Sequence, residues 1–317
     1  MALIILNQIL IMSLFMLIGY LLFRAGKITE EGSRSMANVL AWVVLPCNIL
    51  SGFMTEYSAK RLSEMGISLL LGAFTIFFAA FISAILFRGN GIEQFAATFS
   101  NAGFIGIPLI RAAIGEEGVF YLTGLLVTFN ILQWVRGFHL LREGSWLGRD
   151  ENPADGGGKK NFAAALLRNP MVIASVVGFL IFVLRLGTRL PSVISGCVDG
   201  LMGLNAPLAM IVLGVYLAQS DIPSLFVSKR LYFVSAARLI LIPLLTILIM
   251  APLPVDNHIK MTMIIAGSAP VGANVAVYSQ LLDTDYVYAC RTVTQSTLLS
   301  IVIMPLMMYF ASVLIPV

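Results

Sequence analysis

Long apolar runs alternate with short polar stretches along almost the whole chain. Most runs are about 20 residues long, which is the length that a helix needs to cross roughly 30 Å of hydrocarbon. The pattern predicts ten spanning helices, at residues 3–23, 33–54, 64–87, 92–114, 118–140, 166–186, 192–219, 228–250, 257–281 and 285–314. We therefore expect an all-α membrane protein and not a β-barrel.

The fourth and ninth of these runs are interrupted near the middle by Gly, Pro and Asn. The interruptions are Asn101-Ala-Gly-Phe-Ile-Gly-Ile-Pro108, with Gly103 and Gly106, and Ser268-Ala-Pro-Val-Gly-Ala-Asn274, with Pro270 and Gly272. Pro removes a backbone donor and Gly lowers helix propensity, so both helices should break there and leave backbone groups unpaired at membrane depth. Because lipid cannot satisfy such groups, a matched pair of broken spans indicates the binding site of a transporter.

The two breaks offer donors to an anion. We expect Pro108 to start a half-helix at the first break, and Pro270 or Gly272 to do so at the second. Helix N-termini carry a partial positive charge and attract anions. The side chains of Asn101 and Asn274 either add hydrogen bonds to a bound carboxylate or only cap the broken helices.

Five polar side chains in other apolar surroundings complete the set of candidate substrate-binding residues: Asn48, Asn130, Gln133, Arg111 and Arg238. For the three amides the alternative is hydrogen bonding between helices. Arg111 either pairs with a substrate carboxylate or extends its charge to the membrane surface. Arg238 either holds a carbonyl of a broken helix, faces the anion, or extends toward the cytoplasmic surface.

Composition agrees with the pattern. The chain has 317 residues, of which 59% are hydrophobic and 11% charged, and its mean hydropathy is +0.93, as expected of an integral membrane protein. Thirteen basic residues fall on one predicted side and six on the other, which favours both termini outside. The net charge of +4 then reflects topology and does not indicate nucleic-acid binding.

A polar linker divides the chain into two halves. Residues 142–165 form the expected cytoplasmic linker, between a first five-helix repeat at 1–141 and a second at 166–317. An odd number of helices in each half inverts the second half in the membrane. The spacing of prolines indicates that the two halves are related as repeats. Pro46 and Pro108 are 62 residues apart (108 minus 46), and Pro207 and Pro270 are 63 apart (270 minus 207).

Several classes of function lack support. The carboxylates fall in loops or at span ends, which argues against a cation antiporter that uses Asp at mid-membrane. The two histidines and three cysteines show no metal-ligand spacing, and no catalytic or nucleotide-binding motif occurs. We expect neither an enzyme nor a cofactor nor a metal site.

The residues of the breaks carry a family resemblance. Ser100-Asn-Ala-Gly-Phe-Ile-Gly-Ile-Pro-Leu109 resembles the crossover of the auxin efflux carrier family, which includes the plant PIN carriers and bacterial organic-acid permeases. Similar stretches are Leu45-Pro46, Arg168-Asn-Pro170, Pro207 to Leu217, Arg238 to Pro243 and Ala269-Pro-Val-Gly272.

The resemblance implies ten helices in two inverted five-helix repeats. Helices 1, 2, 6 and 7 would form a scaffold, and the broken helices 4 and 9 would cross in a domain that moves by alternating access. Asn101, Pro108 and Pro270 match the crossover. Asn130 matches a polar position of the fifth helix, and Glu116 an acidic one.

Two departures bear on the substrate. Arg111 stands where the plant carriers have an apolar residue, and the central loop is short, as in the bacterial branch. The likeness to that branch implies localisation in a bacterial inner (cytoplasmic) membrane. An added cation suits a second carboxylate, so we expect transport of a small dicarboxylate such as malonate or malate. An aromatic monocarboxylate such as auxin and an anion channel are the alternatives. Coupling to H⁺ or Na⁺, uniport, and a homodimer all stay open.

Overall fold

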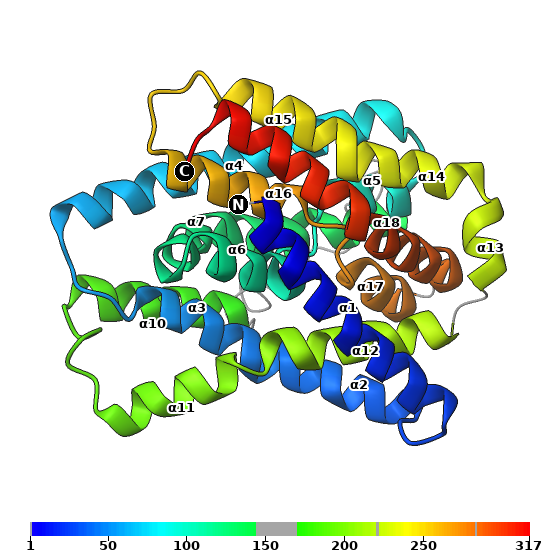
Figure 1. Ribbon diagram of the computed structural model, residues 1–317, viewed down its shortest axis with the longest axis horizontal. Coiled ribbons are helices and arrows are strands. Elements are labelled where there is room, and N and C mark those ends of the chain that lie inside the picture. The colour runs from blue at the N-terminus through cyan, green and yellow to red at the C-terminus, as the bar shows by residue number, and fades with distance from the viewer. Residues whose placement is uncertain (1, 144–169, 220–221, 283) are drawn as a thin grey trace, which may run out of the picture.

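The computed structural model describes residues 2–143, 170–219, 222–282 and 284–317, and every regular element in these ranges is helical (Figure 1). The α-helices are α1 (Ala2–Arg24), α2 (Glu30–Val39), α3 (Leu45–Phe53), α4 (Ala59–Leu86), α5 (Gly91–Thr98), α6 (Ile107–Ala113), α7 (Glu116–Leu132), α8 (Phe138–Glu143), α10 (Pro170–Val183), α11 (Ser192–Met202), α12 (Asn205–Gln219), α13 (Ile222–Val227), α14 (Lys229–Ala236), α15 (Ile242–Met250), α16 (Asn257–Ser268), α17 (Asn274–Leu281) and α18 (Tyr286–Leu314). Four π-helical segments join some of them: η1 (Leu40–Val44), η2 (Ala102–Gly106), η3 (Gln133–Gly137) and η4 (Ala237–Leu241). The predicted linker at 142–165 lies outside the described residues from position 144 onward.

The prediction of an all-helical membrane protein is confirmed. Within the described ranges, six helices are long and apolar enough to cross a membrane: Leu3–Arg24, Glu30–Phe53, Ala59–Leu86, Ser192–Gln219, Lys229–Met250 and Tyr286–Leu314. Two shorter apolar helices occupy Ala102–Ala113 and Pro170–Val183. Large apolar side chains such as Leu70, Val193 and Val302 are exposed on the surface, as lipid contact requires.

Prolines shape several of the long helices. Pro46, Pro108 and Pro243 each follow a π-helical segment by one or two residues. A proline cannot donate to the preceding turn, and a local change of helical register accommodates the lost bond. The span at Ser192–Gln219 consists of α11 and α12, with a turn at Gly203 and Leu204 between them, shortly before Pro207.

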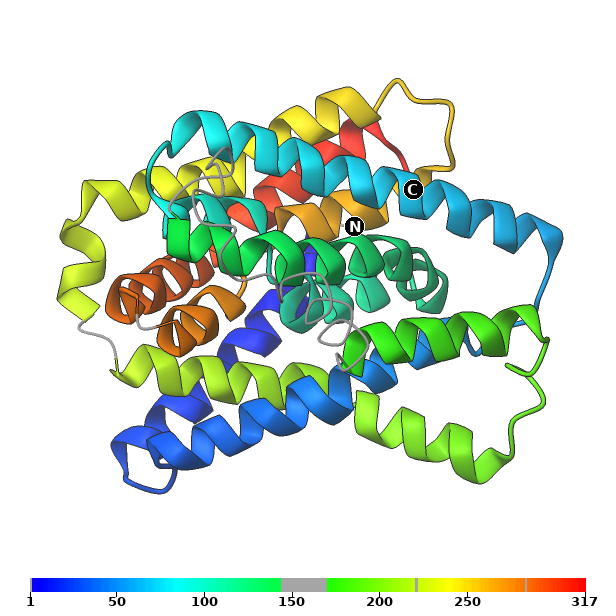
Figure 2. The same ribbon diagram turned by 180° about the vertical axis from the view of Figure 1, so that it is seen from behind.

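The helices pack in two groups, which the two opposite views show one below the other (Figures 1 and 2). In the lower group α1 packs along α12, α3 packs against α10 and α11, and α2 contacts α12. In the upper group α4 packs against α5 and α7, α14 and α15 contact α18, and α16 contacts α4, α7 and α15. The two broken runs belong to the upper group.

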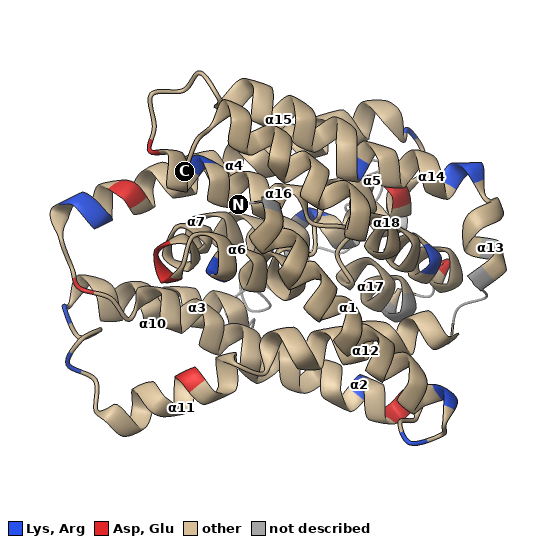
Figure 3. Cartoon of the chain, in the orientation of Figure 1, with Lys and Arg blue, Asp and Glu red and all other residues tan. Residues whose placement is uncertain are grey.

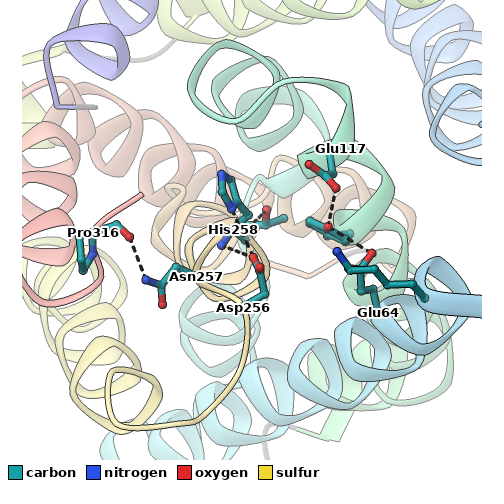
Figure 4. Close-up of polar contacts among 9 residues, drawn as sticks. Glu64, Glu117, Asp256, Asn257, His258 and Pro316 are labelled. Atoms are coloured by element: carbon teal, nitrogen blue, oxygen red, sulfur yellow. Dashed lines mark hydrogen bonds and ion pairs between the residues drawn. The ribbon is translucent and has the colours of Figure 1, made fainter.

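Charged residues gather at the ends of helices and in loops, so that the middle of the bundle is largely uncharged (Figure 3). At one end, Tyr121 Oη lies 2.8 Å from Glu117 Oε1 and 3.4 Å from Glu64 Oε2 (Figure 4). Nearby, His258 pairs with Asp256 at 3.3 Å. These acids lie in the terminal turns of their helices or in a loop, as predicted from the sequence.

The contact between α1 and α12 depends on two glycines. A Cβ atom at Gly214 would overlap the carbonyl oxygen of Met16, and one at Gly19 would overlap that of Ile211. Backbone therefore packs directly on backbone, as small residues permit between membrane helices.

We predict that Gly214→Ala separates α1 from α12 and lowers stability by about 1–3 kcal/mol, the usual cost of overpacking. Thermal unfolding of the detergent-solubilised protein measures the effect. Gly196→Ala is the matched control, because a Cβ there meets nothing within 4 Å. Equal melting temperatures for the two variants would show that this contact is not tight.

Candidate functional site

The two broken runs cross each other and pair through their backbones. The chain leaves helical geometry after α5 and again after α16, and Ser100 faces Val271 in an antiparallel bridge. The N–H of Asn101 donates to the carbonyl of Pro270 at 2.7 Å, and the N–H of Gly272 donates to the carbonyl of Phe99 at 2.9 Å. Each break thus satisfies backbone groups that lipid could not.

The crossing leaves little room for a side chain at Gly272. A Cβ atom there would lie 3.0 Å from the carbonyl oxygen of Ser100 and 3.1 Å from that of Phe99. The glycine at this position therefore favours the close approach of the two extended segments. Val271 adds a further bond, because its N–H donates to Ser296 Oγ at 3.2 Å.

Arg238 holds the carbonyl ends of both helices that stop at the crossing. Its side chain is only 2% exposed and lies in η4. Nη1 donates to the carbonyls of Ala97 at 2.9 Å and Thr98 at 3.2 Å, Nε donates to that of Ala269 at 3.1 Å, and Nη2 donates to that of Gly267. Of the three roles considered from the sequence, extension to the surface is wrong, and holding of the carbonyls is what the structure shows.

The first half-helix begins earlier than the sequence predicted. Helical structure resumes at Ala102, and Pro108 lies inside the continuous run of η2 and α6. The carbonyl of Asn101 accepts the N–H groups of Ile105 at 3.0 Å and Gly106 at 3.1 Å. The side chain of Asn101 makes no capping bond, so the capping alternative is wrong for this residue.

Three buried amide groups beside the crossing have donors without an acceptor. Asn101, Asn130 and Gln133 are 4%, 3% and 1% exposed, and none of their side-chain nitrogens has a hydrogen-bond partner among the residues that the structure describes. Asn130 lies in the last turn of α7, and Gln133 follows one turn later, on the same face. The Nδ2 atom of Asn274 donates to Gln133 Oε1 at 2.9 Å, which leaves the amide nitrogen of Gln133 free to donate.

These amides line two adjoining cavities. A small cavity of about 30 Å³ is bounded by Asn101, Asn130, Asn274, Gly103 and Gly272. A larger one of about 580 Å³ begins at Asn130, Gln133 and Asn274 and extends to Glu30 and Arg34, at the start of α2. The cluster of amides therefore lies at the inner end of an open path.

Asn48 and Arg111 are not brought to these amides. Arg111 Nε donates to Glu116 Oε1 at 2.6 Å, and its Nη1 atom lies 3.4 Å from Asn48 Oδ1. Nη2 lies 3.4 Å from Met202 Sδ. Neither residue lines the two cavities described above.

Two residues at the crossing were missed from the sequence, namely Asn205 and Ser296. Asn205 Nδ2 donates to the carbonyl of Gly103 at 3.0 Å and so joins α12 to η2. A signal existed for Asn205, since it is a polar residue between Gly203 and Pro207 in an apolar run. Ser296 carries no comparable signal, because hydroxyls are common throughout α18.

Removal of the Arg238 guanidinium should destabilise the whole crossing. We predict that Arg238→Met leaves several carbonyls unpaired and costs about 3 kcal/mol or more, since each unsatisfied buried group costs about 1–3 kcal/mol. Thermal unfolding in detergent measures this cost, with Arg24→Met at an exposed position as the control. A melting temperature equal to that of the control would refute the structural role of Arg238.

Comparison with known proteins places the chain in a family. Residues 4–155 and 159–308 match the family described as membrane transport protein. The chain is also 27% identical to an uncharacterized transporter of Methanothermobacter thermautotrophicus, over 307 residues that cover 92% of this chain and 93% of that protein. The protein is therefore an integral membrane protein that belongs to the membrane transport protein family, the auxin efflux carrier family that its motifs resemble.

Proposed function

We propose that the protein is a secondary carrier that moves a small organic anion across the cytoplasmic membrane by alternating access. The observation that carries this proposal is the cluster of unpartnered amide donors of Asn101, Asn130 and Gln133, which line the small cavity or the adjoining part of the larger one. A carboxylate has only acceptors and can take up several donors at once. Asn274 begins α17, whose N-terminus adds a partial positive charge.

Neutral donors suit a carrier, because the substrate must also leave. Among the described residues, no Lys or Arg lines the small cavity beside the crossing. An anion held by amides avoids the strong pairing that a buried cation would give. Binding at this site is therefore expected to be moderate and reversible.

The packing supports two inverted five-helix repeats. If the first half is superposed on the second, the pair of α1 and α12 becomes the pair of α10 and α3, and both pairs are in contact. The bridge between Ser100 and Val271 has reciprocal hydrogen bonds, which are related by a local two-fold axis. The lower and upper helix groups would then be the scaffold and the moving domain.

The two ends of the protein differ in a way that supports alternating access. The larger cavity extends to Glu30 and Arg34, on the predicted cytoplasmic side. At the other end, Arg111 of the upper group contacts Asn48 and Met202 of the lower group. A separate cavity of about 720 Å³ at that end is lined by Glu116 and Met202 and shares no lining residue with the two cavities beside the amides. We infer a state in which the amide cluster is reached from the cytoplasmic side and is separated from the outer cavity.

A dicarboxylate such as malonate or malate is the substrate that we expect. Arg111 lines neither cavity in this state and pairs with Glu116, so it would reach a second carboxylate only in another state of the cycle, in which Glu116 has released it. An aromatic monocarboxylate is the alternative, and the side chains of Phe104, Tyr216 and Tyr278 along the larger cavity favour it.

We predict that a binding carboxylate raises the melting temperature of the purified protein, because a ligand of the folded state stabilises it. Malonate, malate, succinate and indole-acetate would be tested against malonamide, which has no charge. Asn130→Ala should weaken the effective carboxylate about 10-fold or more, since a hydrogen bond to a charged group contributes about 1.5–3 kcal/mol.

The matched control is Asn38→Ala, which removes an amide from the outer part of the same cavity. Equal affinity in Asn130→Ala and Asn38→Ala would remove Asn130 from the site. A shift with indole-acetate alone would favour the aromatic alternative.

Flux distinguishes a carrier from a channel. In proteoliposomes loaded with unlabelled malate, we predict that uptake of labelled malate saturates and passes through a transient maximum, because each substrate must bind before the carrier changes state. An Asn130→Ala and Gln133→Ala double variant should lose this counterflow. Uptake that rises linearly with concentration would favour an anion channel.

A further inference from the structure

The crossing contains a second polar centre, beside α4 and η4, whereas the small cavity of the amide cluster is lined by α3. Both α5 and α16 end at the crossing, so the negative ends of two helix dipoles meet there. The carbonyls that these ends leave unpaired accept hydrogen bonds from one guanidinium, that of Arg238. Among the residues that the structure describes, no carboxylate forms an ion pair with Arg238.

Such a convergence of carbonyls is a place for a cation. In transporters with discontinuous helices, carbonyls of unwound backbone and the C-terminal ends of half-helices coordinate the coupling ion. Here the positive charge is covalently part of the chain and is enclosed, with a residual void of only about 10 Å³ beside it. An arginine keeps its charge and satisfies several carbonyls through its planar set of donors.

The guanidinium and the amide cluster share a wall. Ser100 and Phe129 line both the void beside Arg238 and the small cavity of Asn101 and Asn130. A positive charge on one side of this wall acts on an anion on the other side with less screening than in bulk solvent, because protein atoms lie between them. Arg238 can therefore favour the anion without contacting it.

We propose that Arg238 takes the place of a coupling cation, so that the crossing is complete and can bind its anion without Na⁺ or another inorganic cation. The part of the proposal that concerns the anion rests on the proposed function. The part that concerns the crossing does not. In this scheme Arg238 is a positioning residue, which acts through the backbone of the two breaks.

The wild-type protein provides the first test. Its melting temperature and its titration with malonate would be measured in NaCl and in choline chloride at equal ionic strength. We expect the same melting temperature and less than a 2-fold change in malonate affinity. A much lower melting temperature or a much weaker malonate affinity in choline chloride would show that Na⁺ is required and would overturn the proposal.

Chemical rescue provides the second test and needs no substrate. Arg238→Ala should lower the melting temperature, and millimolar ethylguanidinium should restore a substantial part of the loss. Tetramethylammonium, which is cationic but has no N–H donors, should restore none. The control variant Arg24→Ala should respond to neither compound.

The outcomes separate this proposal from the carrier proposal. Unchanged stability of Arg238→Ala without any added cation would overturn the need for a cation at the crossing, whether or not any carboxylate binds. If Arg238→Ala does not fold, Arg238→Lys provides the variant: it keeps the charge with fewer donors, and its melting temperature should lie below that of wild type and not depend on Na⁺. Stabilisation of Arg238→Lys by Na⁺ would contradict the proposal.

Discussion

Backbone pairing between two interrupted helices is the interaction on which the rest of the structure depends. In hydrocarbon, an N–H or carbonyl without a partner costs several kcal/mol, so a helix breaks there only where something else supplies the partner. Here each break supplies hydrogen-bond partners for the other, through the bonds of Asn101 to Pro270 and of Gly272 to Phe99. Because these bonds replace the helical ones, the chain can leave regular helix at the crossing, and a cluster of amide side chains lies beside it.

The pairing would not suffice without Arg238. The two extended segments at the crossing pair only the backbone groups that face each other. The last carbonyls of α5 and α16 do not face the other segment and need a different donor. The guanidinium takes up four of them and so joins α5, α16 and η4. A buried charge is costly, but here it is offset by hydrogen bonds from several carbonyls and by the two helix ends. These three segments are therefore expected to behave as one rigid unit.

Much of the helical framework could be predicted from the sequence, because long apolar runs have few other options in a membrane. The two breaks could also be located, since Gly and Pro weaken a helix for local reasons. The start of the first half-helix could not, because a π-helical segment accommodates Pro108 within a helix. The partners of Arg238 and Arg111 depend on segments far away in the chain, and no local pattern distinguishes an arginine that binds carbonyls from one that pairs with Glu116. The sequence indicates that Asn130 and Gln133 are polar residues in an apolar run. It does not show that their side-chain nitrogens lack an acceptor, because that depends on which segments pack around them.

The hydrogen bond from Asn205 to the carbonyl of Gly103 has a consequence for the turnover rate of the proposed carrier. It joins the lower helix group to the broken segment of the upper group. If the two groups move against each other as proposed, this bond breaks and forms again at every turnover. A buried hydrogen bond of about 0.5–1.5 kcal/mol corresponds to a rate factor of roughly 2 to 13 if it is lost before the barrier is crossed. A single amide outside the substrate cluster would then help to set the turnover rate of the carrier without altering which anion it accepts.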